Sequence, residues 1–561
     1  IAGVNVIEKG TTNGVITDVE GNWTLNLTTE NPILSFSFIG YKSQETPVGN
    51  KTVLNIILIE DVEVLDEVVV VGYGTQKKKD LTGAIASVSS EDLGKTPTSS
   101  FDQSLQGKIP GVQVTQTTGA PGGNINIMVR GISSISGSNS PLYVIDGYPI
   151  GNGGGGSNMS AFANNSYTAN GMANSTMEKI NPLSTINPSD IESIEILKDA
   201  SATAIYGSRG ANGVVLITTK RGKVGKTTIN IDASIGVQQV AHKVDLLSPR
   251  EYAAYVAEGR DNAWIYAGGK ASDPNDVRTS NTWVRPEFRN PELLPNEGTD
   301  WQDAIFRTAA TTSHNVSISG RGKTVGYFIS ANYYDKEGII INSDFKKYSM
   351  RMNLDGKYKR LKFGLNFSPS YSTSNRVDAS GSNGIVQSAL MMPPVWPVYN
   401  SDGSYNYQGN GYWRIGNDYQ HNAVLNPVAM ANLQSDVVDR MAIVGKVFAE
   451  LELFKGLTYN ISFGGDYYGS HNDQYRSSEL PLLGQKYYDI KSNPTAYSSS
   501  GFYFNWLIEN KINYNTVINE DHSINAVLVQ SAQKETYKGD NVTATDFPND
   551  YIQTISGGTV I

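Results

Sequence analysis

The second half of the chain alternates apolar and polar residues over runs of roughly ten. In the first run, Ile229, Ile231, Ala233, Ile235 and Val237 share one face, while Asn230, Asp232, Ser234 and Gln238 share the other. Similar runs lie at 311–320, 324–335, 346–356, 361–368, 440–453, 457–463, 501–514 and 522–530. Strict alternation predicts strands with one apolar and one polar face, so about nine strands of transmembrane-barrel type are expected.

The connections between these runs alternate in length. Short links lie at 321–323, 355–360, 454–456 and 516–521, and mostly long ones at 241–310, 336–345, 373–439 and 470–500. Barrels of the outer-membrane type have short turns on the periplasmic side and long loops outside. The first strand is therefore expected to start from the periplasmic side. In the first long link, Ser248 and Glu251 predict a capping box before a short helix over 252–257.

Residues 1–61 form a separate pattern of short β segments and turns, which predicts a small β-sandwich. Apolar segments at 4–6, 23–27, 33–39 and 53–59 are its expected strands. The stretch GVNVIEKGTTNGVITDVEGNWTL resembles a carboxypeptidase regulatory-like domain. That family's first strand should precede Gly3, so the chain is expected to lack its true N-terminus.

The linker 62–76 contains the stretch LDEVVVVGYG at 65–74. Four consecutive valines bounded by glycines predict a β-strand. An unpaired strand in a linker is an aggregation hazard, which favours a partner that adds to its edge. The alternative is a buried strand of the neighbouring domain.

Residues 77–223 predict a mixed α/β domain. Its landmarks are LQGKIPGVQV at 105–114, INIMVRG at 125–131, PLYVIDG at 141–147 and IESIEILKDASATAIYGSRGANGVVLITTKRGK at 191–223. In the last segment a short helix is expected over 200–206, with Gly207 as its left-handed cap, before a strand at 214–218. These four landmarks, in this order after a valine run, resemble the plug domain of the SusC/RagA family of TonB-dependent outer-membrane transporters.

The resemblance implies a fold, partners and a transport activity. It implies a mainly β protein, in which residues 224–561 form the first part of an antiparallel barrel of about 22 strands. The TonB box would be Asp66, Glu67, Val68, Val69, Val70, Val71 and Gly72, gripped by TonB with its ExbB/ExbD complex. The plug motif would comprise Arg130, Gly131, Asp146, Gly147, Lys198, Tyr206, Gly207 and Arg209. With Arg221, the arginines Arg130 and Arg209 are candidates for charge networks against the barrel wall.

The implied activity is import of oligosaccharides with a SusD-like surface lipoprotein; import of oligopeptides is the alternative. The N-terminal domain and TonB box would be periplasmic and the long loops extracellular. A rival from another class is a secreted β-rich protein that binds glycans or adheres without transport. Membrane extraction separates these alternatives, because a secreted protein partitions into buffer without detergent.

Size predicts that the chain is incomplete. A plug of about 150 residues is roughly 38 Å across. Nine strands close a barrel of only about 18 Å, whereas 22 strands give about 44 Å. The remaining strands are expected after Ile561. The Gly/Asn/Ser-rich insert that follows Gly147 is longer than the family pattern requires, and we expect a plug loop there.

Composition narrows the function classes. The chain has 561 residues, a formal charge of −9 and no cysteine, which argues against nucleic-acid binding and thiolate metal sites. Its five histidines are scattered without a His-Glu-x-x-His pair. We therefore expect no enzyme, metal or cofactor.

Aromatic residues concentrate in the long links. Candidate contacts to a substrate or a lid protein are Trp264, Trp283, Trp396, Trp413 and Tyr487. Flat rings with polar edges suit sugars and protein interfaces alike, and they also serve loop packing or an aromatic girdle.

Overall fold

The structure is a computed structural model of the whole chain. It describes residues 3–11, 13–29, 31–38, 41, 43–49, 51–58, 68–71, 74–77, 85–90, 105–116, 119–123, 125–131, 139–150, 186–379, 384–407, 414–415, 418–419, 425–481, 492–518 and 522–560. The chain divides into two compact units, Ile1–Thr82 and Gly83–Ile561, and each is described by itself. The glycine-rich insert at 151–185 lies outside the described residues.

The first unit contains a four-stranded antiparallel sheet in the order β2-β1-β3-β4. Its strands are β1 (Asn5–Glu8), β2 (Gly14–Ile16), β3 (Ile33–Ser37) and β4 (Gln44–Pro47). One face buries Val6, Leu34 and Phe36. The stretches 22–28 and 51–58 are not strands, contrary to expectation, but their apolar residues pack against this face. They supply the second layer of the predicted sandwich without a second sheet.

The valine run forms β5 (Val68–Val71), and it already has a partner within the chain. β5 pairs antiparallel with β6 (Gly74–Lys77), with Val69 opposite Gln76. These two strands form a sheet of their own, so the other edge of β5 pairs with no described strand. The rest of the predicted TonB box, Asp66, Glu67 and Gly72, lies outside the described residues.

The second unit begins with the plug, whose main sheet has the order β11-β10-β13-β12-β7. The strands are β7 (Ile85–Ser89), β10 (Leu142–Ile145), β11 (Tyr148–Pro149), β12 (Ile191–Leu197) and β13 (Val214–Thr219). Only β10 and β13 run parallel. A separate hairpin pairs β8 (Val112–Gln116) with β9 (Ile125–Val129).

The predicted helix at 200–206 is wrong in its extent. The α-helix α4 covers only Ala200–Thr203, and a 3₁₀ segment, η6, continues over Ala204–Gly210. Gly207 does not cap a helix in the left-handed region; it kinks η6 at φ 60° and ψ −145°. Only glycine adopts that backbone region without strain, so the glycine is needed for a different reason from the one expected.

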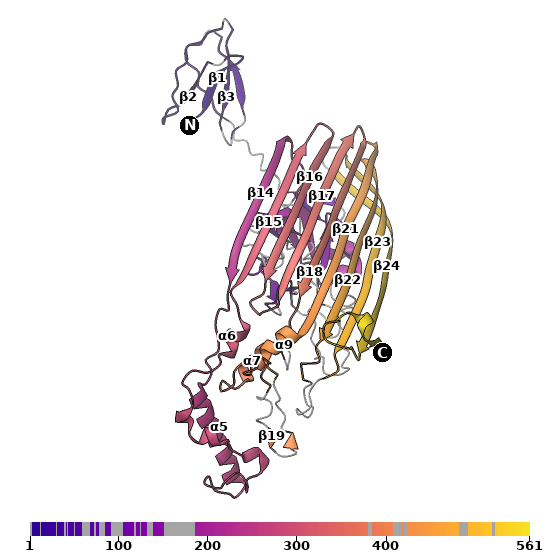
Figure 1. Cartoon of the computed structure of the whole chain (residues 1–561). Coiled ribbons are helices and arrows are strands. Elements are labelled where there is room, and N and C mark those ends of the chain that lie inside the picture. Colours follow the sequence, from indigo (N-terminus) through magenta and orange to yellow (C-terminus); the bar gives the residue numbers. More distant parts are fainter. Residues whose placement is uncertain are drawn as a thin grey trace. The chain divides into compact units, whose positions relative to one another are not determined.

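The long strands form one antiparallel sheet in the order β14-β15-β16-β17-β18-β21-β22-β23-β24-β25 (Figure 1). The strands are β14 (Gly225–Gln238), β15 (Ala309–Arg321), β16 (Val325–Glu337), β17 (Asp344–Tyr358), β18 (Leu361–Asn375), β21 (Gln434–Phe454), β22 (Leu457–Arg476), β23 (Thr495–Ile518), β24 (His522–Thr545) and the short β25 (Thr559–Val560). The nine strands predicted from alternation are confirmed. We call this sheet the barrel wall.

The wall is polar inside and apolar outside. Side chains such as Asn353, Asp466 and Asn505 are at most 1% exposed on the inner face, where the plug packs. On the outer face of the same sheet, Ile235 is 80% exposed. This reversal of ordinary globular burial is the pattern of a sheet that faces lipid on one side.

Two rows rich in aromatic residues cross the outer face at separate heights. Cross-strand pairing aligns His314, Tyr333, Tyr348 and Tyr371 in one row and Tyr358, Leu361, Leu451 and Tyr459 in the other. Along β17, ten residues separate Tyr348 from Tyr358, which is about 25 Å of height at ~3.3 Å rise and ~40° tilt. That height matches the apolar band of outer-membrane barrels, which girdles of aromatic residues flank.

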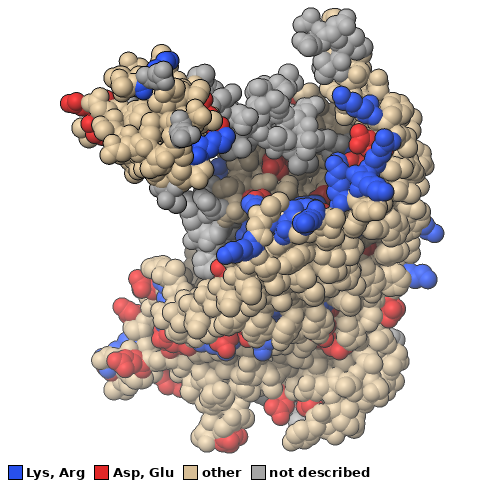
Figure 2. Space-filling model, turned by 90° about the horizontal axis from the view of Figure 1, so that it is seen from above, with Lys and Arg blue, Asp and Glu red and all other residues tan. Residues whose placement is uncertain are grey.

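The strands are joined by short turns at one end and by long connections at the other, as predicted (Figure 1). The long connections carry α5 (Pro249–Tyr266), α6 (Trp301–Ile305), α7 (Ile385–Met391), α9 (Pro427–Leu433) and the two-residue strands β19 (Arg414–Ile415) and β20 (Asp418–Tyr419). Single 3₁₀ turns lie at Pro188–Asp190, Ser280–Thr282, Pro286–Arg289, Pro291–Leu293 and Ile555–Gly557. The Ser248–Glu251 capping box is present, but α5 is much longer than expected. Seen from the short-turn end, Lys and Arg gather along the rim of the wall (Figure 2).

None of the helices in the described ranges has both the length and the apolar character needed to cross a lipid bilayer.

Candidate functional site

The contact between plug and barrel wall centres on a tight hairpin. β10 and β11 are joined by two residues, Asp146 and Gly147, and Ile145 pairs directly with Tyr148. Both turn residues have positive φ, 48° for Asp146 and 75° for Gly147. Asp-Gly with two positive φ angles is the signature of a type I′ turn, whose twist matches the flanking strands. The turn holds three successive side chains and carbonyls against the wall.

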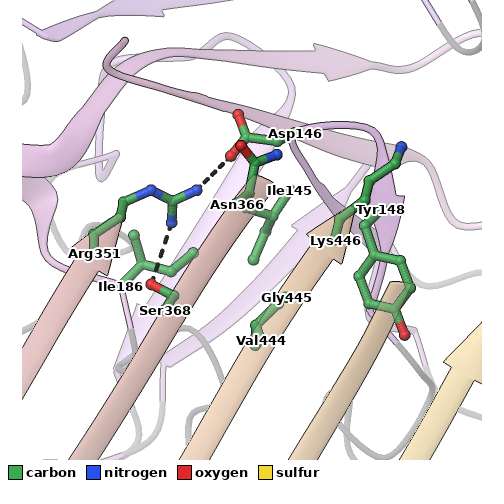
Figure 3. A pocket seen from close by; sticks show the side chains of 10 residues that line it. All are labelled: Ile145, Asp146, Tyr148, Ile186, Arg351, Asn366, Ser368, Val444, Gly445 and Lys446. Atoms are coloured by element: carbon green, nitrogen blue, oxygen red, sulfur yellow. Dashed lines mark hydrogen bonds and ion pairs between the residues drawn. The ribbon is translucent and has the colours of Figure 1, made fainter. Parts of the chain in front are cut away.

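Asp146 forms a buried ion pair with Arg351 of β17 (Figure 3). Their side chains are only 1% and 3% exposed. The Asp146 carboxylate also accepts hydrogen bonds from the backbone N–H and the hydroxyl of Thr219, at 3.1 and 2.7 Å. Arg221 lies 3.9 Å away. Because a buried charge is costly unless it is paired and hydrogen-bonded, this shell lets Asp146 remain ionised at the wall.

The next residue, Gly147, contacts a different strand. Lys446 of β21 donates from Nζ to the Gly147 carbonyl at 3.0 Å. A Cβ built on Gly147 would lie 3.3 Å from that same Nζ. Glycine is thus required here both for its positive φ and for the approach of the lysine.

Tyr148 continues the contact onto two further strands. Its hydroxyl donates to Asp466 Oδ1 of β22 at 2.6 Å, and Asn505 Nδ2 of β23 donates to both groups at 2.8 and 2.7 Å. Gln533 of β24 donates to Asn505 Oδ1 at 2.9 Å and accepts from Arg209 Nη1 at 2.8 Å. The chain of bonds therefore leaves the plug at Tyr148 and returns to it at Arg209.

Little space separates plug and wall around this hairpin (Figure 3). The cavity there has a volume of about 10 Å³, and its lining includes Asp146, Arg351, Asn366 and Lys446. Such a volume holds about one water molecule. Asn366 is 5% exposed, and neither its amide oxygen nor its amide nitrogen has a hydrogen-bond partner. A solute cannot pass along this part of the wall unless the hairpin moves away from it.

Of the other predicted plug residues, Arg130 does not reach the wall. It has φ 61° and pairs with Asp199 inside the plug, next to Gly131 at φ 89°. Lys198 donates to the Pro110 carbonyl, which ties β12 to the loop before β8. Tyr206 is 8% exposed in a cluster with Leu142 and Val214. These residues are placed as internal supports of the plug, whereas Asp146, Gly147, Arg209 and Arg221 lie at or beside the wall contact.

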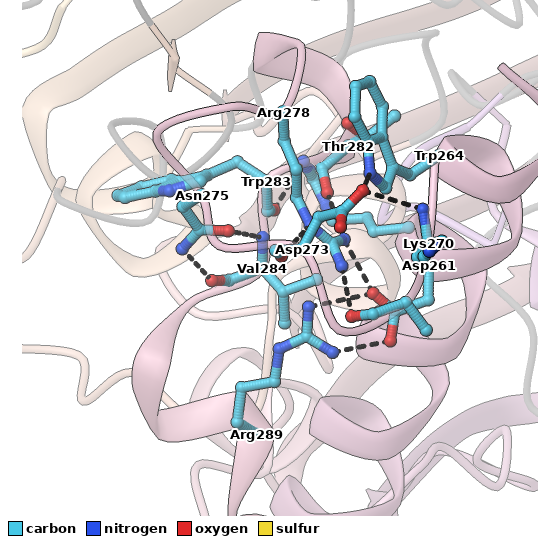
Figure 4. Close-up of polar contacts among 12 residues, drawn as sticks. Asp261, Trp264, Lys270, Asp273, Asn275, Arg278, Thr282, Trp283, Val284 and Arg289 are labelled. Carbon is cyan, nitrogen blue, oxygen red and sulfur yellow. Dashed lines mark hydrogen bonds and ion pairs between the residues drawn. The ribbon is translucent and has the colours of Figure 1, made fainter. Parts of the chain in front are cut away.

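Two of the predicted aromatic contacts lie in a helical layer within the first long connection (Figure 4). Trp264 of α5 is half-buried and donates from its indole N–H to Asp273 at 2.9 Å. Trp283 is half-buried, and its carbonyl accepts from Arg260. Asp261 joins the layer through ion pairs of 2.7 Å to Arg278 and 2.5 Å to Arg289. Burial works to raise the pKa of Asp261, but the two arginines together lower it below its ordinary value.

Trp396 is placed differently from these two. It is 7% exposed and packs in a cluster with Trp301, Ile385 and Leu425, beneath α7 and α9. Its burial assigns it to loop packing, which was one of the alternatives for the aromatic set. Trp413 and Tyr487 lie outside the described residues. Across the described ranges, no group of three His, Asp or Glu side chains is arranged to hold a metal ion.

Sequence reasoning missed the wall partners of the hairpin, which are Arg351, Lys446, Asp466, Asn505 and Gln533. Alternation assigns each of them to the inner face of a strand, but it does not identify which inner residues meet the plug. The Asp-Gly pair before Tyr148 was a usable signal for the hairpin itself.

Family models match two parts of the chain. The TonB-dependent receptor plug domain matches residues 77–214, and the carboxypeptidase regulatory-like domain matches residues 1–70.

Among curated proteins, TonB-dependent receptor SusC of Bacteroides thetaiotaomicron is 37% identical over 89% of this chain and 46% of its own length. TonB-dependent receptor P26 of Formosa agariphila is 37% identical over 95% of this chain and 48% of its own length. The chain thus spans about half the length of the curated relatives it matches.

Among solved structures, the RagAB peptide importer in its open-open state superposes with a TM-score of 0.66. Its identity is 24%, and the match covers 88% of this chain and 52% of that one. At this identity the likeness concerns the fold. Together with the plug match and the receptors at 37% identity, it supports one assignment: the chain belongs to the SusC/RagA family of TonB-dependent transporters.

Proposed function

We propose that the full-length protein imports a solute across the outer membrane, driven by TonB. The observation that carries this proposal is the seating of the plug hairpin against four adjacent wall strands, β17, β21, β22 and β23. The cavity of about 10 Å³ between them is far too small for a nutrient. Passage therefore requires displacement of buried ionic and hydrogen-bonded contacts, which needs an external source of work.

The proposed point of force is the valine run. β5 has one edge paired with β6, and its other edge pairs with no described strand. A partner sheet can add to that edge through main-chain hydrogen bonds, or it can displace β6. In this proposal TonB, energised by ExbB/ExbD, binds 66–72 from the periplasm, and the tension reaches the plug through β7, the first plug strand in the chain and an edge strand of its sheet.

We propose oligosaccharides as the cargo, with oligopeptides as the second candidate. The half-buried rings of Trp264 and Trp283 suit stacking on sugar faces. The second candidate is favoured by the fold of RagAB, which is a peptide importer. The long connections, which carry these rings, would face outward beneath a SusD-like lipoprotein.

Uptake by cells tests both parts of the proposal. Full-length protein, expressed with its lipoprotein partner, would be offered labelled oligosaccharides or labelled oligopeptides, with and without TonB. We expect TonB-dependent accumulation of one class and TonB-independent binding of that class at the surface. Accumulation that is unchanged without TonB would contradict the transport mechanism. Accumulation of peptides alone would contradict the oligosaccharide assignment and leave the mechanism intact.

A further inference from the structure

The short turns of the barrel wall are basic. Three of them lie within the described residues, at 322–324, 359–360 and 455–456. Their only charged residues are Lys323, Lys359, Arg360 and Lys455, which are four of the seven turn positions. Lys and Arg make up 45 of the 561 residues, and the chain carries a formal charge of −9. So dense a group of cations is a local feature that runs against the charge of the whole chain. We call these four residues the basic arc.

Neighbouring carboxylates do not neutralise the basic arc. At the adjoining strand ends, Arg321 pairs with Asp355 and Lys362 pairs with Glu450. Among the ion pairs of the described residues, none includes Lys323, Lys359, Arg360 or Lys455, and all four side chains are exposed. Figure 2, viewed from this end, shows Lys and Arg gathered along the rim. The fourth short link, 519–521, lies outside the described residues and contains Glu520 and Asp521, so the arc is limited to the turns between β15 and β22.

Exposed apolar side chains lie directly beside these cations. Tyr358 is 61% exposed, Leu453 45% and Phe454 56%. Lys359 lies over the Tyr358 ring, with Nζ 5.5 Å from the ring centroid. Tyr358 also belongs to the row that bounds the apolar band of the outer face. Rings at the edge of a bilayer with lysines reaching beyond them are the arrangement of a membrane interface.

We propose that the basic arc binds the anionic headgroups of phospholipids in the leaflet that surrounds the short turns. The proposal rests on the membrane location within the proposed function, and it adds a lipid class and a binding site. The position of the arc just beyond the apolar band places its cations at the depth of lipid phosphates, and the side chains are long enough to reach them. The three turns are adjacent in the wall, because β15, β16, β17, β18, β21 and β22 are successive strands. Neighbouring headgroups are therefore held along one continuous rim.

Lipid titration of the full-length protein in detergent tests the site. Short-chain phosphatidylglycerol and phosphatidylcholine would be compared by native mass spectrometry. The variant Lys359→Gln/Arg360→Gln/Lys455→Gln removes three charges from exposed turns. We expect its affinity for phosphatidylglycerol to fall at least about tenfold, since each juxtamembrane cation contributes on the order of 1 kcal/mol. Its binding of phosphatidylcholine should not change.

A charge-preserving variant serves as the control. Lys359→Arg/Arg360→Lys/Lys455→Arg changes every side chain of the test variant and keeps the charge, so it should bind phosphatidylglycerol like the wild type. Equal loss in both variants would overturn the electrostatic assignment, and undiminished binding by the glutamine variant would leave the arc to another partner, such as an acidic protein segment. Full competition by inorganic phosphate at the lipid's own concentration would show a free-anion site and overturn the headgroup assignment.

Two readouts separate this inference from the proposed function. Membrane insertion and TonB-dependent uptake would be measured for the wild type in parallel. A wild type that inserts and imports but shows no preference for phosphatidylglycerol contradicts the lipid site alone. A wild type that does not insert into membranes contradicts the proposed function, and the lipid site with it.

Discussion

Tyr148 and Asp466 are 318 positions apart in the chain, yet the Tyr148 hydroxyl donates a 2.6 Å hydrogen bond to Asp466 Oδ1. The tyrosine is 1% exposed and the aspartate 0% exposed. One residue belongs to the plug hairpin and the other to wall strand β22. This bond, with the Asp146–Arg351 ion pair, ties the two parts of the second unit together.

Replacing Tyr148 with Phe removes that hydroxyl and leaves a buried carboxylate with a donor missing. We expect a loss of about 1–3 kcal/mol in the free energy of unfolding. Thermal and denaturant unfolding of the full-length protein would measure it. Tyr467→Phe is the matched control, because Tyr467 lies one residue from Asp466 on the outer face and stacks on Phe502. If both variants lose equally, the hydroxyl of Tyr148 is not a stabilising contact.

Replacing Asp146 with Asn leaves the Arg351 guanidinium buried without its counter-charge. Breaking a buried ion pair from one side costs about 3–5 kcal/mol. The exposed pair Lys223–Glu192 provides a comparison, and Lys223→Gln should cost about 1 kcal/mol or less. A double-mutant cycle with Asp146→Asn and Arg351→Met isolates the pairwise energy. A coupling energy near zero would contradict the role of this pair.

Replacing Gly147 with Ala introduces a Cβ at φ 75° and 3.3 Å from Lys446 Nζ. Left-handed backbone costs a residue with a Cβ about 1–2 kcal/mol. We expect a loss of stability of that order. Gly236→Ala on β14 is the control, because a Cβ there has no atom within 4 Å. Equal stability of the two alanine variants would show that the type I′ turn tolerates a side chain.

The first unit should respond to acid through Glu8. Hydrogen bonds from Thr29, Asn13 and Thr28 lower the pKa of Glu8 to about 2, although desolvation opposes them. The side chain has no solvent-exposed surface, but only a thin layer of residues covers it, so the bonds outweigh the desolvation. Because the folded-state pKa is below the unfolded value near 4.3, the stabilisation is present above that value and is lost as the pH falls towards 2.

Hydrogen exchange of peptides from β1 and β3 in the full-length protein would follow this loss between pH 4.5 and pH 2. Glu8→Gln should be less stable at neutral pH and should lack the acid-dependent step attributed to Glu8. An unchanged acid profile in that variant would assign the transition to other carboxylates.

The valine run can be tested by two substitutions at one position. Val69→Pro removes a backbone donor and disfavours pairing with any strand, so uptake should be abolished while surface binding of substrate remains. Val69→Thr keeps the donor and the β-branched shape, and it should import normally. Normal uptake by the proline variant would show that this strand does not transmit force from TonB.

The extent to which sequence predicts this protein differs between the wall and the plug. Alternation identified all nine long strands and their inner faces, because side-chain direction in a strand has a period of two and one face must match lipid. The alternating connection lengths also followed from the sequence. The helix at 200–206 was wrong because the kink at Gly207 depends on how η6 packs, which periodicity does not report.

Local sequence determined the elements: the long strands, the capping box at Ser248 and, through its Asp-Gly pair, the hairpin before Tyr148. Only the tertiary structure decided that Asp146 meets Arg351, that Gly147 meets Lys446, and that Tyr148 and Arg209 join one hydrogen-bonded chain. It also placed the cations of three separate turns on one rim. Partners up to 357 positions apart are brought together by sheet register and by the seating of the plug, and neither leaves a mark in local residue patterns.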